Sequence, residues 1–235
     1  MRRRTLAALA LAFALLPALP AKADTESWNW LEVRVPVSEG RGAMPNTLRL
    51  VTDFRYAGRA GGLTQTFLRV GPIWDLNPHL LMAAHVTAVA NRSGAGAYEQ
   101  EHRLELEPNL RGRWGLVGYN DRNRLEYRWG TAGPRWRYRN QLWLNLAPAD
   151  ARWIPFVWDE VLFDLAGTPT TGFTQNRASV GIGRMLSDST RLNLGYVLRS
   201  RQTAASVWEH DHIALVNLLV APAVPPLWNP VDRDD

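Results

Sequence analysis

Three consecutive segments of alternating chemical character, between Ile154 and Arg201, constrain the fold of this chain more than any other feature. They read IPFVWDEVLFDL, FTQNRASVGIGRML and RLNLGYVLRSR, and the short turn-forming stretches AGTPTTG and SDST separate them. Side chains of an extended strand alternate between its two faces with period 2. The last segment therefore places mainly leucine and tyrosine on one face and arginine and asparagine on the other. Such segments predict a β-meander with one apolar and one polar face.

The same rhythm of strands and turns extends along most of the chain. The connections are rich in turn-forming residues, as in RAGG, NRSGAG, RGRWG and GTAGP. No helical period of useful length appears, and no internal repeat of about 20–50 residues is present. We therefore expect strands at residues 28–37, 48–56, 63–70, 79–89, 98–107, 114–129, 135–146, 154–165, 173–186, 191–201 and 212–220.

The first residues carry the pattern of an export signal. Three arginines at positions 2–4 precede an apolar run at 6–16, and the stretch Ala21-Lys22-Ala23 provides small residues for signal peptidase. Residues 1–23 are therefore predicted to be a signal peptide that directs export through the Sec pathway. A barrel is predicted over 24–220, and the proline-rich stretch 221–235 is predicted to be a tail. No run reaches the roughly 18 apolar residues of a membrane-spanning helix.

Composition excludes several classes of function. Cleavage would remove three arginines and the only lysine, so the 27 basic residues would become 23 against 22 acidic ones. A net charge near zero gives no support to nucleic-acid binding, which needs a surplus of positive charge on one face. The absence of cysteine excludes disulfides, thiolate metal sites and a cysteine nucleophile.

Alternation alone does not say which face of a barrel points outward. A soluble barrel buries its apolar face, whereas an outer-membrane barrel exposes it to lipid. The segments are long enough to cross a membrane as tilted strands, and their mid-segment arginines would each cost about 2–4 kcal/mol against lipid. Tryptophans lie near segment ends, as in an interfacial girdle. They are Trp28, Trp30, Trp114, Trp129, Trp136 and Trp153.

These features predict an all-β fold, an antiparallel up-and-down transmembrane β-barrel of 10 to 12 strands in the outer membrane. Bacterial single-chain barrels have even strand counts. The chain is therefore expected to form ten strands, with Trp28–Val37 outside the wall, or twelve, which we favour. Expected partners are outer-membrane lipid and, during biogenesis, periplasmic chaperones and the barrel-assembly machinery, with no nucleic acid. A soluble periplasmic binding barrel is an alternative.

Several segments resemble a known family. WDEVLFDL, FTQNRASVGIGRML, RLNLGYVLR and the preceding NRLEYRW are similar to the "domain of unknown function 2490" family of Gram-negative exported proteins. The matching positions are Arg124, Glu126, Arg128, Glu160, Asn176, Arg177, Gly195 and Tyr196. The resemblance implies an outer-membrane β-barrel and carries no established activity, so it supplies no catalytic residues.

Charged residues that alternate along the predicted strands, and so share one face of the wall, form the main candidate site. By period 2, the residues expected to point into the lumen are Arg103, Arg124, Glu126, Arg128, Arg137, Arg139, Glu160 and Arg177. One interpretation is structural, because arginine and carboxylate neutralise each other through bidentate pairs and fix the wall. The other is a small channel, because arginine-lined constrictions select anions. The sequence leaves both open.

The remaining chemistry is sparse. His210 and His212 share one face but lack the three or four ligands of a zinc site, so we expect no metal and no cofactor. His102 falls on the apolar face of its strand, where a lipid- or glycolipid-modifying enzyme would need a partnered histidine. No Gly-x-Ser-x-Gly elbow accompanies it, so no enzyme activity is expected and that class stays an alternative. Gly181 and Gly183 share a face with Arg177 and are expected to make room for a neighbouring arginine or a bend.

Overall fold

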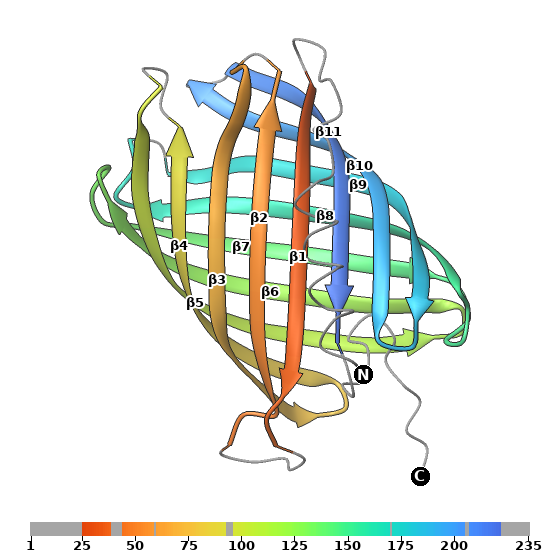
Figure 1. Cartoon of the computed structure of the whole chain (residues 1–235). Coiled ribbons are helices and arrows are strands. Elements are labelled where there is room, and N and C mark those ends of the chain that lie inside the picture. The colour runs from red at the N-terminus through yellow and green to blue at the C-terminus, as the bar shows by residue number, and fades with distance from the viewer. Residues whose placement is uncertain are drawn as a thin grey trace, which may run out of the picture.

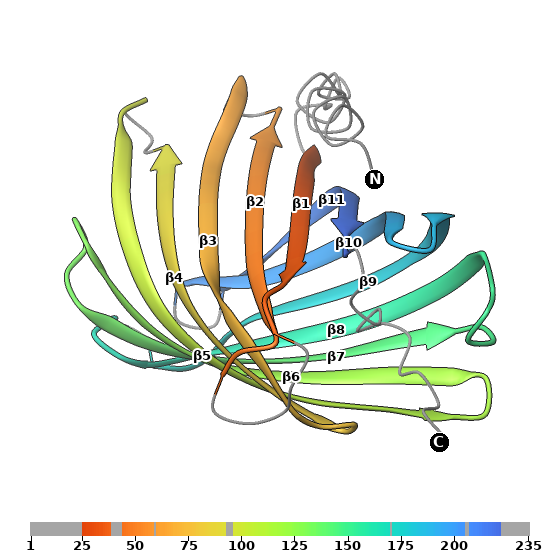
Figure 2. The ribbon, with the colours of Figure 1, turned by 60° about the horizontal axis from the view of Figure 1, so that its bottom comes forward.

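The computed structural model describes residues 25–38, 44–58, 60–92, 96–169, 171–204 and 207–221. Every regular element in these ranges is a strand, and eleven strands form one closed barrel (Figures 1 and 2), so the predicted all-β barrel is confirmed. The described ranges hold no helix that is long and apolar enough to cross a membrane. The predicted signal peptide at 1–23 lies outside them, as does the predicted tail at 221–235 apart from Ala221.

Each strand corresponds to one predicted segment. The strands are β1 (Thr25–Pro36), β2 (Thr47–Ala57), β3 (Gly62–Asn77), β4 (Leu80–Arg92), β5 (Tyr98–Trp114), β6 (Val117–Gly130), β7 (Arg135–Leu146), β8 (Trp153–Ala166), β9 (Gly172–Ser187), β10 (Thr190–Ala204) and β11 (Val207–Val220). Of these, β3, β5 and β11 extend several residues beyond the predicted bounds.

The barrel closes through a parallel pair of strands. Consecutive strands pair antiparallel, but β1 lies beside β11 (Figure 1) and pairs with it in parallel, from Thr25 opposite His212 to Val33 opposite Val220. The predicted range of 10 to 12 strands includes the observed eleven, whereas the expectation of an even count, and of twelve, is wrong for the described residues. With an odd count the first and last strands run in the same direction, so only a parallel ladder closes the wall. The segment from Trp28 therefore belongs to the wall.

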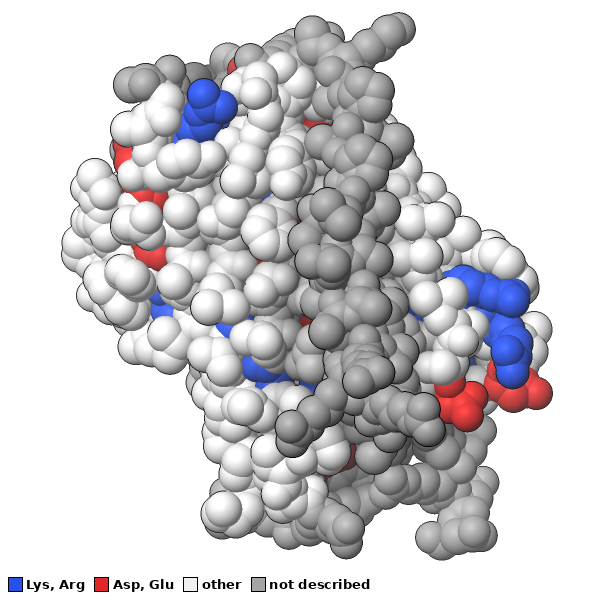
Figure 3. Space-filling view, viewed as in Figure 1, with Lys and Arg blue, Asp and Glu red and all other residues white. Residues whose placement is uncertain are grey.

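The pleat of the strands sorts two kinds of side chain to the two sides of the wall. On β5, Glu101, Arg103 and Glu105 are buried, whereas Leu104 and Leu106 are each 50% exposed. This is the period-2 alternation expected of a strand. The outer surface visible in Figure 3 is mostly uncharged, with charged side chains gathered in a few places, some of them at its margin. The apolar face therefore points outward and the charged face inward.

Aromatic rings contact one another on the outside near one end of the barrel, the end that holds the β6–β7 turn. Their centroids lie 4.9 to 6.3 Å apart, in two groups formed by His102, Tyr127, Trp129 and Trp136 and by Tyr138, Phe163, Phe173 and Trp208. We call these rings the aromatic band. Such contacts are typical of the belts that flank the apolar zone of membrane barrels.

Two tryptophans that were predicted to lie in the girdle point inward instead. Trp28 is 0% exposed, and Trp30 packs against the same inner cluster. Both occupy even positions of β1, as do the buried Glu32 and Arg34, so the pleat assigns all four to the interior. The expectation of a lipid-facing role for Trp28 and Trp30 is therefore wrong.

The strand β5 is longer than predicted. The sequence RGRWG was expected to be a connection, but β5 continues to Trp114, and the turn to β6 occupies residues 115–116. Gly115 adopts a φ of +56° there. Glycine reaches this left-handed conformation without a steric penalty, so the second glycine of RGRWG alone marks the turn.

Candidate functional site

The interior face of the wall carries all eight residues that were predicted to line the lumen. Adjacent strands bring them together, since Arg124 lies opposite Arg139 and Glu126 opposite Arg137 in the β6–β7 ladder. Each of the eight makes at least one ion pair, and they are Arg103, Arg124, Glu126, Arg128, Arg137, Arg139, Glu160 and Arg177. Their charges therefore meet inside the barrel.

Glu160 on β8 is shared by three arginines. Its Oε1 accepts from Arg122 Nη2 at 2.8 Å and from Arg139 Nη2 at 2.7 Å, and its Oε2 accepts from Arg177 Nη1 at 2.9 Å. These arginines come from β6, β7 and β9, on both sides of β8. Glu160 itself is 1% exposed, so a single buried carboxylate holds three cations.

Glu107 and Glu126 connect the other strands to this arrangement. Arg49 Nη1 donates to Glu107 Oε1 at 3.0 Å, and Arg124 binds the other oxygen of the same carboxylate. Arg139 Nη1 donates to Glu126 Oε1 at 2.9 Å, while its Nη2 reaches Glu160. Charge-assisted bonds of this kind fix the wall because each arginine bridges carboxylates from different strands.

Arginines outnumber carboxylates in the interior. We define the central network as the carboxylates whose side chains are at most 11% exposed, with the arginines that pair with them. The carboxylates are Glu32, Asp53, Glu101, Glu105, Glu107, Glu126, Glu160 and Asp164, and the arginines are Arg34, Arg49, Arg55, Arg69, Arg103, Arg122, Arg124, Arg128, Arg135, Arg137, Arg139 and Arg177. Among the described residues this network has four more arginines than carboxylates, an excess that is costly to bury without a counter-charge.

The excess is concentrated on the surface of an internal cavity. The cavity has a volume of about 320 Å³. Of the twenty-six described residues that line it, fourteen are arginines and one, Glu32, is acidic. The other carboxylates of the central network do not line the cavity. A ligand inside the cavity would therefore meet guanidinium groups.

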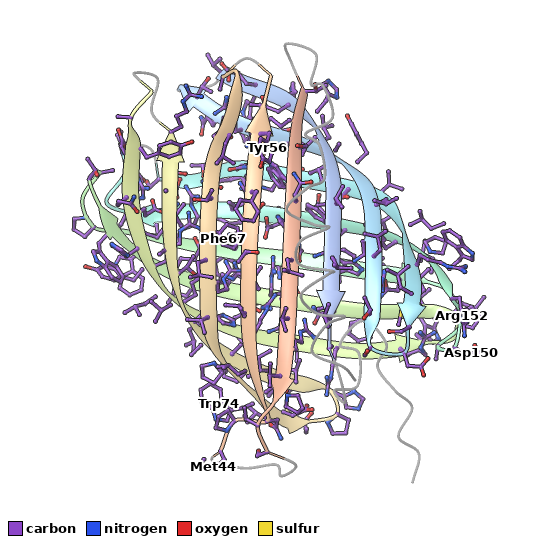
Figure 4. All side chains as sticks on the ribbon, viewed as in Figure 1. Met44, Tyr56, Phe67, Trp74, Asp150 and Arg152 are labelled. Carbon is purple, nitrogen blue, oxygen red and sulfur yellow. The ribbon has the colours of Figure 1, made fainter. Side chains whose placement is uncertain are left out.

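The cavity extends along the barrel. On β10 its lining residues run from Arg191 to Arg201, which is most of the strand Thr190–Ala204. Ten residues of strand span about 33 Å along the strand. Phe67, which also lines the cavity, lies between the levels of Tyr56 and Trp74 in Figure 4. The cavity therefore follows much of the length of the wall.

A different chemistry occupies the interior behind β8, β10, β11 and β1. We call this the apolar cluster: Trp28, Phe156, Trp158, Val197, Ile213 and Leu215, all buried. The guanidinium of Arg55 lies 4.0 Å from the ring centroid of Trp28, and that of Arg177 lies 5.0 Å from it, so cation–π contacts join the cluster to the charged region. Trp30 and Trp143 pack against the cluster and line the cavity. They form the boundary between the two regions.

The predicted set missed several interior charges that parity alone would have found. Glu101, Glu105 and Glu107 share the face of Arg103, and Arg122 shares that of Arg124. Arg49 on β2 was not recognised because its partner Glu107 lies 58 residues away in the chain. No local pattern reports such a pairing, since it depends on the closure of the barrel.

Gly183 makes room for an arginine, which is one of the two roles predicted for the strand glycines Gly181 and Gly183. A Cβ at Gly183 would lie 2.4 Å from Arg191 Nε and 2.7 Å from Asn193 Oδ1. At Gly181 a Cβ would instead meet the backbone oxygen of Leu194 at 2.4 Å. Gly183 therefore makes room for polar side chains, whereas Gly181 makes room for the Phe156 ring, 2.3 Å from such a Cβ, and for the backbone of β10.

The histidines do not assemble a metal site. The described residues contain no group of three or more histidines or acidic residues that could hold an ion. His102 contacts the ring of Trp129 in the aromatic band. On the outer face, His210 Nδ1 lies 2.9 Å from Ser200 Oγ, and His212 Nδ1 lies 2.5 Å from the Tyr196 hydroxyl. The sequence did not predict the Ser200–His210 pair, because the two residues meet only across the β10–β11 hairpin.

Comparison with known proteins agrees with the resemblance seen in the sequence. An uncharacterized protein of Methylorubrum extorquens is 29% identical over 166 residues, which cover 67% of this chain and 73% of that protein. No solved structure matches the chain. The model of the DUF2490 family, described as a protein of unknown function, matches residues 25–210, from the first strand into the last. The chain therefore belongs to the DUF2490 family.

Proposed function

We propose that this protein is exported to the outer membrane, spans it as a β-barrel, and admits small anions through its arginine-lined lumen. The observation that carries the proposal is the composition of the cavity wall, where fourteen arginines accompany one carboxylate among the described residues. Rings of arginine select negative solutes because they stabilise an anion that has shed part of its water. The proposed role is a narrow anion-selective channel.

The outward face supports the membrane location. Its strands contain 11 to 17 residues, which is enough for a tilted strand to cross the hydrocarbon core. Leucine and valine dominate the exposed positions of these strands, and the aromatic band lies near one end. Contact with outer-membrane lipid, and with chaperones and the assembly machinery during export, belongs to the same proposal. Recovery of the protein in the soluble periplasmic fraction after cell lysis would contradict it.

A barrel filled for purely structural reasons would carry the same ion pairs without conducting. Planar-bilayer recording distinguishes the two. The purified protein is first shown to be folded by its heat-dependent mobility in gels. We expect discrete current steps after insertion. A folded and inserted barrel that passes no current would reject the channel and leave the structural role.

One observation favours a second candidate, a lipid-modifying enzyme. Ser200 and His210 face outward at hydrogen-bonding distance, beside the Phe173–Trp208 contact of the aromatic band. A serine next to a histidine base is the minimal arrangement for nucleophilic attack on an ester. Labelling of the folded protein by a fluorophosphonate probe, and loss of labelling in Ser200→Ala, would support this activity. Absence of labelling would reject it.

A further inference from the structure

The three arginines around Glu160 have more donors than Glu160 has acceptors. Arg122 and Gln141 are partners in the β6–β7 ladder, Gln141 and Glu160 in the β7–β8 ladder, and Glu160 and Arg177 in the β8–β9 ladder. One row across the wall therefore brings Arg122 and Arg177 to either side of Gln141 and Glu160. Each guanidinium has five N–H groups, so three of them greatly exceed the capacity of one carboxylate.

The three arginines line the cavity. Arg122, Arg139, Gln141 and Arg177 all line it, whereas Glu160 does not. Among the described residues, Arg122 and Arg177 form ion pairs with no carboxylate other than Glu160. An excess of buried positive charge is costly, and an anion in the cavity would offset it.

We infer that Arg122, Arg139 and Arg177 form a binding site for a tetrahedral oxyanion of the phosphate class. The site deepens the proposed function, on which its access through the lumen rests. Guanidinium forks match the spacing of phosphate oxygens and bind them through paired N–H···O bonds. A phosphate also carries the charge that the shared carboxylate lacks. The cavity of about 320 Å³ is large enough for inorganic phosphate or a small phosphate monoester.

Binding is measured separately from conduction. Isothermal titration calorimetry of the folded protein in neutral detergent, with inorganic phosphate as the probe and chloride held constant, is expected to show saturable binding. In a neutral planar bilayer the same phosphate concentrations should reduce the chloride current to a plateau, because a bound oxyanion occupies the passage.

A variant that keeps the positive charge of an arginine but changes its shape tests whether the guanidinium geometry is needed for phosphate binding. Arg122→Lys retains one positive charge but removes the bidentate fork, so phosphate affinity should fall at least tenfold. Where Arg122→Lys fails to fold, Arg177→Lys provides the same comparison. Arg184→Lys is the matched control, because Arg184 stacks on Trp153, 4.4 Å from the ring centroid, and does not line the cavity. It should bind phosphate as the wild type does.

The outcomes separate the two proposals. Chloride current without phosphate binding would overturn the oxyanion site and leave the channel. Phosphate binding without current would overturn the channel and leave the site. Equal affinity in Arg122→Lys and wild type would also overturn the site. If glycerol 3-phosphate competes with inorganic phosphate for binding, the site exists and its ligand is a soluble phosphate ester. If only phosphatidylglycerol in the micelle competes, the site exists and its ligand is a lipid headgroup.

Discussion

The central network and the apolar cluster occupy the same interior face of one barrel and differ in almost every physical respect. Both consist of alternate residues along tilted strands, and the pleat points the side chains of both regions into the barrel. The central network lies around a cavity of about 320 Å³ and holds more arginines than carboxylates. The apolar cluster is packed, with Trp28, Phe156 and Val197 each 0% exposed.

This difference indicates that the two regions have different roles, one in stability and the other in permeation. The apolar cluster lies behind the seam where the barrel closes, because Trp28 on β1 is directly opposite Leu215 on β11. A parallel ladder is slightly less stable per residue than an antiparallel one, so the seam gains most from packing behind it. Most residues of the central network lie on antiparallel strands between β2 and β9, and only Glu32 and Arg34 among them lie on β1. The network surrounds the cavity instead of filling the interior. We expect stability to depend mainly on the cluster and permeation mainly on the network.

The largest loss of stability is expected for Trp28→Ala. The substitution opens a cavity in the apolar cluster and removes the cation–π contacts with Arg55 and Arg177. The free energy of unfolding should therefore fall by about 4 kcal/mol. Urea unfolding followed by tryptophan fluorescence and gel mobility measures it. Trp114→Ala is the control, because Trp114 is 86% exposed. An equal loss of unfolding free energy in Trp28→Ala and Trp114→Ala would contradict the expectation that stability depends mainly on the apolar cluster.

Glu160→Gln is expected to have the next largest effect. The neutral amide leaves Arg122, Arg139 and Arg177 without their shared carboxylate. Removal of one partner from a buried ion pair costs about 3 kcal/mol. Part of the loss should return in phosphate buffer relative to chloride at equal ionic strength, because an oxyanion can replace the carboxylate. Wild-type stability in chloride would show that Glu160 does not balance these arginines.

The two strand glycines provide a matched comparison between the regions. Gly181→Ala places a methyl group against the Leu194 carbonyl oxygen and the Phe156 ring, whereas Gly183→Ala meets the flexible end of Arg191. The backbone and the packed ring have little room to move, so Gly181→Ala should cost about 2 kcal/mol and Gly183→Ala less. Chemical unfolding of the two variants measures the order. The reverse order would mean that the charged region is the more rigid one.

The smallest effect is expected at an exposed ion pair outside the central network. Arg201 and Glu209 form an ion pair at 3.0 Å, with side chains 46% and 52% exposed. Such pairs contribute less than about 1 kcal/mol, so Arg201→Gln should hardly change unfolding. Because Arg201 lines the cavity, the same variant should still lower anion selectivity. A large loss of stability would contradict the assignment of stability to the cluster.

The sequence predicted the fold class and the inward arginines because both follow from period 2 within single strands. It did not predict the parallel closure, since no local pattern records which strand the first one pairs with. Trp28 and Trp30 were assigned to the outside because tryptophan is common at membrane interfaces, although they share parity with Glu32 and Arg34. The cavity and the sharing of Glu160 depend on the register of β6 to β9, which alternation does not fix.

The most direct test of the central claim is the reversal potential of the current through the folded protein in a bilayer that separates two potassium chloride concentrations. The account predicts a potential close to the chloride equilibrium value, and a shift toward zero for Arg177→Gln. A potential close to the potassium value in the wild type would contradict the claim that the arginine-lined lumen selects anions.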